Sequence, residues 1–189
     1  MKDCFSYEAH DYRIRPLGAD DAVAFQDFYR ALARPEHYVD FLKDKNLDDL
    51  TVWKDLLNAV HEADFHMFGL WDGPKLIGQT GLAYREADGK TIACYTGSQI
   101  ADHYQGRGLS KMLYDVRKEY LKGIDFNGPQ ETYIEPDNKK SIGAAKKNGF
   151  VVTDDPLRDE KYLTLRLQPV SEMWLHNHRN GLKIPDKNL

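Results

Sequence analysis

A short stretch near the middle of the chain combines glycine, cationic and small polar residues in an order suited to anion binding. It runs Ile100-Ala-Asp-His-Tyr-Gln105-Gly-Arg-Gly-Leu-Ser110, and an apolar helical pattern follows it directly. The first turn of a helix leaves backbone N–H groups without intrahelical partners, and the helix dipole adds partial positive charge there. Glycine permits close approach of the backbone to a ligand, so Gly106 and Gly108 favour a phosphate site at this turn.

Two common phosphate-binding motifs are excluded by the residues that follow. A P-loop requires Gly-Lys-Ser/Thr after its first glycine, and this stretch has no such sequence. A dinucleotide-binding turn requires a third glycine at G-x-G-x-x-G, where this chain has Lys111. On these residues alone, an ordinary glycine turn or a site for another phosphate ligand stays open.

A second segment carries the residues of a helix start and a helix end. Asn138-x-x-Ser141-Ile142 is followed by Lys147-Asn148-Gly149-Phe150. Asn is a favoured N-cap residue, and a glycine just after a helix adopts left-handed backbone conformation easily. The spacing predicts a helix over Asn138–Asn148 with Gly149 as its left-handed cap.

The two segments together resemble the coenzyme A site of the GNAT superfamily of N-acetyltransferases. Gln105-x-x-Gly108-x-Ser110 resembles the pyrophosphate loop, Gln/Arg-x-x-Gly-x-Gly/Ala, and Ser110 departs from it at the last position. The segment from Asn138 to Phe150 resembles the family motif that starts Asn-x-x-Ala/Ser and ends Lys-x-Gly-Phe. The resemblance covers about residues 12–167. It implies transfer of an acetyl group from acetyl-CoA, the co-substrate, to a primary amine by direct attack.

The resemblance also implies the residues of the site. In the family, the backbone N–H that corresponds to Ile100 meets the thioester carbonyl, where it would stabilise a developing oxyanion. The amides of 107–110 hold the pyrophosphate, Asn138 contacts the pantetheine end, and a cationic side chain contacts the ribose phosphate. The implied cofactor-binding residues are Ile100, Gln105, Gly106, Arg107, Gly108, Leu109, Ser110, Lys111, Asn138, Ser141 and Lys147.

More than one residue is a candidate for the base and for the acid of the reaction. A lysine-like amine with a pKa near 10.4 costs about 4.6 kcal/mol to deprotonate at pH 7, so such an acceptor needs a base. Relatives place a carboxylate on the fourth strand, but Thr91–Ile100 contains no Asp or Glu. The family's thiolate-protonating tyrosine corresponds to Ala145, which leaves Ser141 as the candidate acid or as a coenzyme A contact. The candidates for the base are Glu135, Glu86 and a water held by Tyr95.

Periodicity predicts the elements that position these residues. Predicted strands lie at 12–17, 65–71, 76–84, 91–100, 132–135, 150–153 and 162–167. Predicted helices cover about 22–32, 48–61, 109–122 and 138–148, with Gly123 ending the third. The order predicts an α/β (α+β) fold with a mixed, mostly antiparallel sheet of about six or seven strands and about four flanking helices. The resemblance adds that strand 91–100 splays from its parallel neighbour, 132–135, with a bulge at Gly97.

Length and charge limit the function further. The chain has 189 residues, with 26 Lys and Arg against 30 Asp and Glu, a balance that argues against a general nucleic-acid binder. No apolar run reaches the ~18 residues of a membrane span, and the N-terminus lacks the apolar core of a signal peptide. Two cysteines make no disulfide framework, and His176-x-His178 alone makes no zinc site. We therefore expect a cytoplasmic protein without a metal or a membrane partner.

We expect one acetyltransferase domain over 1–168 and a C-terminal extension over 169–189, docked on the domain or at the contact of a homodimer. Residues 1–65 carry 8 Lys and Arg against 14 Asp and Glu, which suits a cationic acceptor: a small amine, a polyamine, or a protein N-terminus or lysine. We expect the acceptor to lie over the region built by 32–61 and the loop near 156–161. The acids of this region that favour a cation are Glu36, Asp40, Asp44, Asp48 and Asp49. A non-catalytic acyl-CoA-binding regulatory module is the alternative, because the strand carboxylate and the motif tyrosine are missing.

Overall fold

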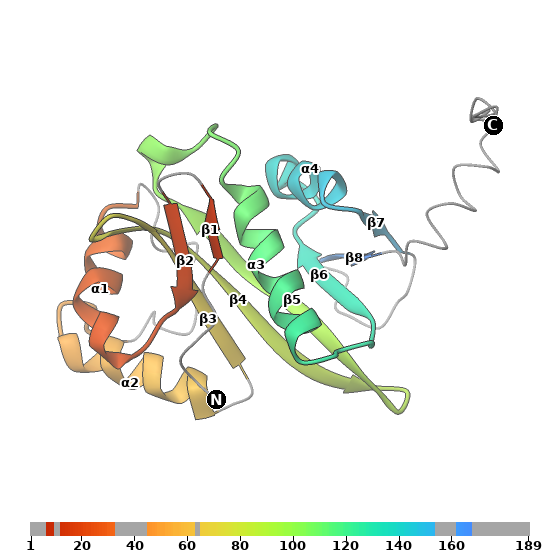
Figure 1. The fold of residues 1–189 in the computed structure, drawn as a ribbon, viewed down its shortest axis with the longest axis horizontal. Helices are drawn as coiled ribbons and strands as arrows, with labels where there is room; N and C mark the ends of the chain where they lie inside the picture. The colour runs from red at the N-terminus through yellow and green to blue at the C-terminus, as the bar shows by residue number, and fades with distance from the viewer. Residues whose placement is uncertain (1–6, 10–11, 33–44, 63–64, 154–161, 168–189) are drawn as a thin grey trace. The chain divides into compact units, whose positions relative to one another are not determined.

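The computed structural model describes residues 7–9, 12–32, 45–62, 65–153 and 162–167 (Figure 1). The chain falls into two units, residues 1–130 and 131–189. The described elements of the first unit are β1 (Tyr7–Ala9), β2 (Tyr12–Pro16), α1 (Ala22–Arg30), α2 (Leu50–Glu62), β3 (Phe65–Asp72), β4 (Lys75–Ala87), β5 (Lys90–Ile100) and α3 (Ser110–Gly123). None of the described helices is long and apolar enough to span a membrane.

Strands β1 to β5 form an antiparallel sheet in which each strand pairs with the next along the chain, with α1 and α2 inserted between β2 and β3. Asp72-Gly73 closes the β3–β4 hairpin, and Asp88-Gly89 closes the β4–β5 hairpin, with positive φ at Gly73, Asp88 and Gly89. Asp and Gly tolerate this backbone conformation, which matches the twist of the flanking strands. Both turns lie between the strands predicted at 65–71, 76–84 and 91–100.

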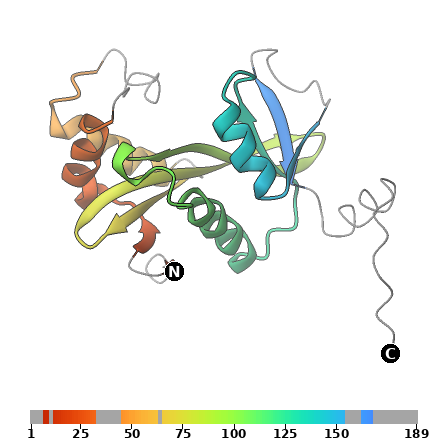
Figure 2. The same ribbon diagram turned by 90° about the horizontal axis from the view of Figure 1, so that it is seen from above.

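The side chains of β3 alternate between two layers. Met67 and Trp71 belong to the buried cluster formed with α1 and α2. His66 and Phe68 lie on the opposite face, where their rings are 4.7 and 5.5 Å from the ring of Tyr120 in α3. Successive side chains of a strand point to opposite faces, and Figure 2 shows α1 and α2 on one side of the strands and α3 on the other.

Aromatic residues form the centre of the layer between α1, α2 and the sheet. Phe25 and Trp53 are almost fully buried, and their rings meet edge to face at 5.6 Å. Tyr29 lies one helical turn from Phe25, with a centroid distance of 4.9 Å. Such edge-to-face pairs add to the stabilisation from buried area, so this cluster fixes α2 against α1.

The described elements of the second unit are β6 (Gln130–Ile134), which begins at the last residue of the first unit, α4 (Lys139–Lys147), β7 (Phe150–Val152) and β8 (Leu163–Leu167). Strand β8 pairs antiparallel with both β6 and β7. Gly149 has a φ of +91° directly before β7. The left-handed cap predicted at this glycine is therefore confirmed.

The predicted fold class is confirmed, with some differences in detail. Within each unit every described ladder is antiparallel, and the four expected helices are present. Strand β1 was not predicted, because three residues are too few to show alternation. Gly123 stays helical, and the left-handed residue after α3 is Asp125 with a φ of +53°. The opening between 91–100 and 132–135 stays a prediction, and the predicted boundary after 168 lies outside the described residues.

Candidate active site

The backbone N–H of Ile100, the last residue of β5, points away from β4. The next residue, Ala101, donates its N–H to the carbonyl of Ile77 in β4 at 2.8 Å. Successive N–H groups of an extended strand point to opposite edges, so the Ile100 N–H points to the edge that does not face β4. The Ile100 carbonyl accepts from Gln105 Nε2 at 3.1 Å. The Ile100 N–H is therefore a hydrogen-bond donor at that edge, and Gln105 binds the carbonyl of the same residue.

Gly97 forms a β-bulge shortly before the end of β5. Thr80 of β4 pairs with Ser98, whereas Gly81 pairs with Thr96, so Gly97 is the extra residue. Its φ is +20°, at the border of the region that favours glycine. A bulge bends its strand and increases the local twist, which redirects the residues that follow. The bulge predicted from this glycine is confirmed.

The chain then turns through a glycine loop into the N-terminus of α3. Gly106 and Gly108 have φ of +79° and +78°, and no atom lies within 4 Å of the place where a Cβ would stand on either. Within the described residues, the backbone N–H groups of 106–110 have no hydrogen-bond acceptor. Unpaired N–H groups and the positive end of the helix dipole together favour an anion. The loop thus has the geometry that the sequence predicts for a phosphate group.

The side chains of Gln105 and Arg107 donate hydrogen bonds to neighbouring residues of the loop. Gln105 Nε2 also donates to Asp102 Oδ1 at 3.0 Å, so Gln105 closes the turn on itself. Arg107 donates from Nη2 to the His103 carbonyl at 3.0 Å. Arg107 therefore brings a positive charge to the same turn, while Gln105 acts on the backbone of the loop.

The start of α3 supplies the remaining candidates of the first motif. Lys111 Nζ pairs with Asp115 Oδ2 at 2.5 Å and is largely exposed. Leu109 is buried, so the loop offers its backbone N–H and not its side chain. Ser110 is half-buried at the first position of α3. The structure therefore brings all residues from Ile100 to Lys111 to one end of β5 and α3, and their contacts with a cofactor stay predictions.

Tyr104 anchors the glycine loop to the β3–β4 hairpin. Its hydroxyl donates to Asp72 Oδ2 at 2.8 Å, and this hydrogen bond is the main cause that raises the pKa of Tyr104. Two cations lie over its ring, Arg107 Cζ at 4.9 Å and Lys75 Nζ at 5.6 Å from the centroid. Both distances are in the range of a cation–π contact. The position of the loop therefore depends on a residue outside the family motif.

The second unit carries the residues predicted from the second motif. Asn138 caps α4, because its Oδ1 accepts from the Ser141 N–H at 3.1 Å. Glu135 is exposed just after β6, and its carbonyl accepts from the Asn138 N–H at 3.0 Å. Ser141 is half-buried in the first turn of α4, whereas Lys147 is exposed in its last turn. Glu135, Asn138 and Ser141 therefore lie together at the N-terminal end of α4, and their roles stay predictions.

Two of the candidates for the base, Glu86 and a water held by Tyr95, do not suit that role in this structure. Glu86 pairs with Thr91 at the start of β5. Thr91 is about nine residues, or ~30 Å along the strand, from Ile100, so Glu86 is too far away to act there. Tyr95 is buried and donates its hydroxyl to Gln130 Oε1 at 2.7 Å, and burial raises its pKa. The hydroxyl proton is thus donated to an amide oxygen. This contact does not favour Tyr95 as the residue that holds a catalytic water.

Neither Ala145 nor Cys94 offers an acid or a base at the protein surface. Alanine has no titrating group, and the thiol of Cys94 is buried. Ala145 is completely buried in α4, so the position of the family tyrosine belongs to the packing of the second unit. Cys94 is a buried free thiol in β5. Among the described residues, no group of three or more His, Cys, Asp and Glu side chains is placed to hold a metal ion.

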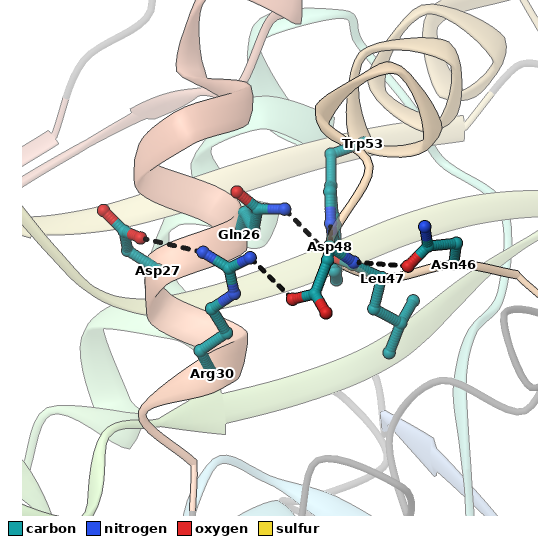
Figure 3. Close-up of polar contacts among 7 residues, drawn as sticks. All are labelled: Gln26, Asp27, Arg30, Asn46, Leu47, Asp48 and Trp53. Carbon is teal, nitrogen blue, oxygen red and sulfur yellow. Dashed lines mark hydrogen bonds and ion pairs between the residues drawn. The ribbon is translucent and has the colours of Figure 1, made fainter.

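Figure 3 shows how the segment before α2 is tied to α1. The Leu47 carbonyl accepts from Gln26 Nε2 and from Trp53 Nε1, both at 2.8 Å. Arg30 donates from Nη2 to Asp48 Oδ1 at 2.7 Å. The chain that enters α2 is therefore fixed to both helices, and the carboxylate of Asp48 already has a cationic partner.

The acids predicted for the acceptor region have different environments. Asp49 accepts from the Thr51 N–H at 2.9 Å and from the Thr51 hydroxyl at 2.7 Å, and the hydroxyl bond is the main cause that lowers its pKa. It therefore caps the start of α2, as Asp side chains commonly do. Glu36, Asp40 and Asp44 lie outside the described residues.

A buried polar group beside the bulge is not predicted by the sequence patterns. Gln79 and Gln99 pair across β4 and β5, are 3% and 8% exposed, and each lies 3.4 Å from the Tyr29 hydroxyl. Their Nε2 atoms are both 3.7 Å from the place where a Cβ of Gly97 would stand. A glutamine within an apolar strand, as in Leu76-Ile-Gly-Gln79, is the signal that could have indicated this group.

The family model described as the acetyltransferase (GNAT) family matches residues 25–150. The match covers two thirds of the chain and includes the glycine loop and α4. The chain belongs to the GNAT acetyltransferase family. No curated protein sequence matches this GNAT protein.

Solved structures share the fold of this GNAT protein at low sequence identity. The ribosomal-protein-S5-alanine acetyltransferase of Vibrio fischeri is 18% identical, with a TM-score of 0.68 over 88% of this chain and 100% of that chain. The PaiA N-acetyltransferase of Thermoplasma acidophilum, in complex with coenzyme A, is 18% identical, with a TM-score of 0.64 over 85% and 100%. A spermidine N-acetyltransferase chimera of Vibrio cholerae and hSSAT is 20% identical, with a TM-score of 0.60 over 83% and 93%. These likenesses confirm the predicted fold.

Proposed function

We propose that this protein transfers an acetyl group from acetyl-CoA to a primary amine, by direct attack of the amine in a ternary complex. The observation that carries the proposal is the set of unpaired N–H groups at 106–110, an anion site suited to the pyrophosphate of coenzyme A. Family membership supports acetyl transfer as the reaction class. The coenzyme A complex of the similar PaiA structure supports the choice of co-substrate.

In the proposed reaction, Ile100 supplies the oxyanion donor. The amine nitrogen attacks the thioester carbonyl carbon, the C–N bond forms, the C–S bond breaks, and the departing thiolate takes up a proton. Negative charge develops on the carbonyl oxygen, and the Ile100 N–H points to a strand edge where it can stabilise that charge. A single donor of this kind contributes about 10²–10³-fold to kcat.

We propose Glu135 as the base and Ser141 as the proton donor to the thiolate. Both lie at the N-terminal end of α4, Glu135 exposed to solvent and Ser141 half-buried. A base matters for a lysine-like amine, which costs about 4.6 kcal/mol to deprotonate at pH 7, and much less for an N-terminal amine, which costs about 1–1.4 kcal/mol. Coenzyme A binding is a second use of the Ser141 hydroxyl.

We expect Glu135→Gln to lower kcat by about 10²-fold for a lysine-like acceptor at pH 7, with the affinity for coenzyme A unchanged. The defect should shrink as pH rises towards the pKa of the amine, because a neutral amine needs no base. Ser141→Ala should lower kcat at every pH if the hydroxyl protonates the thiolate. Steady-state thiol release between pH 7 and pH 9 measures both effects. A Glu135→Gln variant with wild-type kcat at pH 7 would remove Glu135 as the base.

Removing the Tyr104 hydroxyl should weaken acetyl-CoA binding by about three- to tenfold, because the loop loses one hydrogen bond to a carboxylate. Calorimetry of Tyr104→Phe measures the change. Tyr120→Phe is the matched control. It removes a hydroxyl that lies 3.0 Å from His66 Nε2, towards the other end of α3, and should keep the affinity within twofold. Equal affinities in the two variants would show that the anchor at Asp72 does not set the loop geometry.

We propose a cationic acceptor: a small amine, a polyamine, or a protein N-terminus or lysine. Acidic residues in the first third of the chain support this class, although Asp48 and Asp49 already bind Arg30 and Thr51. The similar structures include a ribosomal-protein-S5-alanine acetyltransferase and a spermidine N-acetyltransferase chimera, and both names are compatible with an amine acceptor. We also propose a cytoplasmic homodimer in which 169–189 contributes the contact, which light scattering of a chain truncated after Gln168 would test.

Calorimetric titration with acetyl-CoA and with coenzyme A, followed by a thiol-release assay over amines, polyamines and basic peptides, tests the proposed function. Binding with thiol release establishes the enzyme and its acceptor class. Binding without release on any acceptor favours the second candidate, a non-catalytic acyl-CoA-binding regulatory module. The lack of a carboxylate in β5 and the buried Ala145 are the observations that favour this candidate. No binding would contradict both.

A further inference from the structure

One arginine lies inside the first unit, on the apolar face of α3. Arg117 is 1% exposed, and it lies four residues from Leu113 and four from Leu121, which are both fully buried. Its Cζ is 4.2 Å from the ring centroid of Tyr95 and 4.7 Å from that of Tyr114. In the described part of the chain, no carboxylate lies within 4 Å of the guanidinium. Two aromatic faces and backbone carbonyls therefore surround this charge.

The guanidinium donates to backbone carbonyls at the β5 bulge. Its Nε donates to the Leu113 carbonyl at 2.9 Å, which holds the side chain against its own helix. Its Nη1 donates to the carbonyls of Gly81 and Thr96, both at 3.4 Å. These two residues are the last register pair before Gly97 shifts the β4–β5 ladder. One side chain thus joins α3 to both strands where their register changes.

Stability alone does not account for this arrangement. Burial lowers the pKa of Arg117 to about 10, and Nη2 has no hydrogen-bond partner within the described residues. An aliphatic residue of similar volume would fill the apolar stripe without the cost of removing a charge from water. The guanidinium Nη1 instead donates to one carbonyl on each strand, next to the bulge. The contacts therefore indicate a role in backbone geometry.

We propose that Arg117 is a positioning residue that holds the β5 bulge and, through it, the direction of the Ile100 N–H during acyl transfer. The kinetic part of this inference rests on the proposed function. Gly97 is separated from Ile100 by only two residues of β5, so a change at the bulge re-aims the oxyanion donor. The anion loop belongs to the N-terminus of α3, and its N–H groups at 106–110 make no hydrogen bond to the described residues of β5. Loss of Arg117 should therefore lower kcat and keep the affinity for coenzyme A.

Hydrogen exchange of the whole chain tests the structural part without any assay of activity. Arg117→Met keeps most of the volume and removes the donors, whereas Leu121→Ala is the matched control that weakens the same helix away from the bulge. We expect the amides of 96–101 to exchange at least about tenfold faster in Arg117→Met and within about twofold of wild type in Leu121→Ala. Equal exchange of 96–101 in the two variants would overturn the proposal.

Kinetics test the link to catalysis. We expect kcat to fall at least about tenfold in Arg117→Met, with the Kd of coenzyme A within about twofold of wild type. Arg117→Lys keeps a donor, so it should regain part of both kcat and the exchange protection, and it also serves if Arg117→Met does not fold. Wild-type kcat in Arg117→Met would overturn the catalytic role. If the wild-type chain shows no turnover, the proposed function fails, and the exchange result alone decides whether Arg117 holds the bulge.

Discussion

A Gly108→Val variant should lose at least about 100-fold in affinity for acetyl-CoA, or ~2.7 kcal/mol, while it stays folded. Gly108 has a φ of +78°, and the space where its Cβ would stand is open. A valine there strains the backbone and projects its methyl groups beside the unpaired N–H groups of 106–110, where we expect the pyrophosphate. Calorimetry measures the affinity, and thermal unfolding checks that the variant is folded.

Gly89→Val provides the matched control for backbone strain. Gly89 has a φ of +69° and equally open surroundings, but it lies in the β4–β5 hairpin turn, at the opposite end of β5 from Ile100. This variant should show a similar loss of stability with an affinity within about twofold of wild type. If Gly108→Val binds acetyl-CoA as tightly as Gly89→Val does, the ligand does not bind at the glycine loop.

The second large effect is expected in the second unit, where Arg166→Met should destabilise the β6–β8 ladder by about 3–5 kcal/mol. Glu131 is completely buried, and its Oε1 accepts from Arg166 Nε at 2.8 Å and Nη2 at 2.5 Å. Tyr133 donates its hydroxyl to Oε2 at 2.6 Å. Loss of the arginine removes two hydrogen bonds and a positive charge from a buried carboxylate, which costs far more than the loss of an exposed ion pair.

Hydrogen exchange of the peptides that cover 130–134 and 163–167 measures this effect for the unit itself. A loss of 3–5 kcal/mol corresponds to exchange faster by about two to four powers of ten, up to the limit set by global unfolding. The double variant Glu131→Gln/Arg166→Met also removes the buried negative charge, and it should recover part of the loss. Exchange in Arg166→Met at the wild-type rate would show that water already screens the Glu131 carboxylate.

Local signals in the sequence determined most of the elements and the anion loop. The Asp-Gly turns, the glycines at 106 and 108, and the cap at Gly149 depend on the φ of single residues, which residue type strongly restricts. Alternation and helical spacing predicted the strands and helices to within a few residues, because burial of one face imposes the period. The glycine-loop motif is short because the N–H groups expected to bind phosphate belong to consecutive residues.

Tertiary structure decided what depends on partners distant in sequence. Tyr104 became the anchor of the loop only because the β3–β4 hairpin brings Asp72 to its hydroxyl. Asp48 and Asp49, acids suited to a cationic acceptor by charge alone, are bound to Arg30 and Thr51. In sequence, Arg117 is one charged residue among others on a helix, and only packing places its guanidinium at the β5 bulge. The two motifs thus carried the resemblance to the family, and the glycine spacing predicted the loop. The positions of distant side chains set their charge partners and hydrogen bonds, because these interactions act only over a few ångströms.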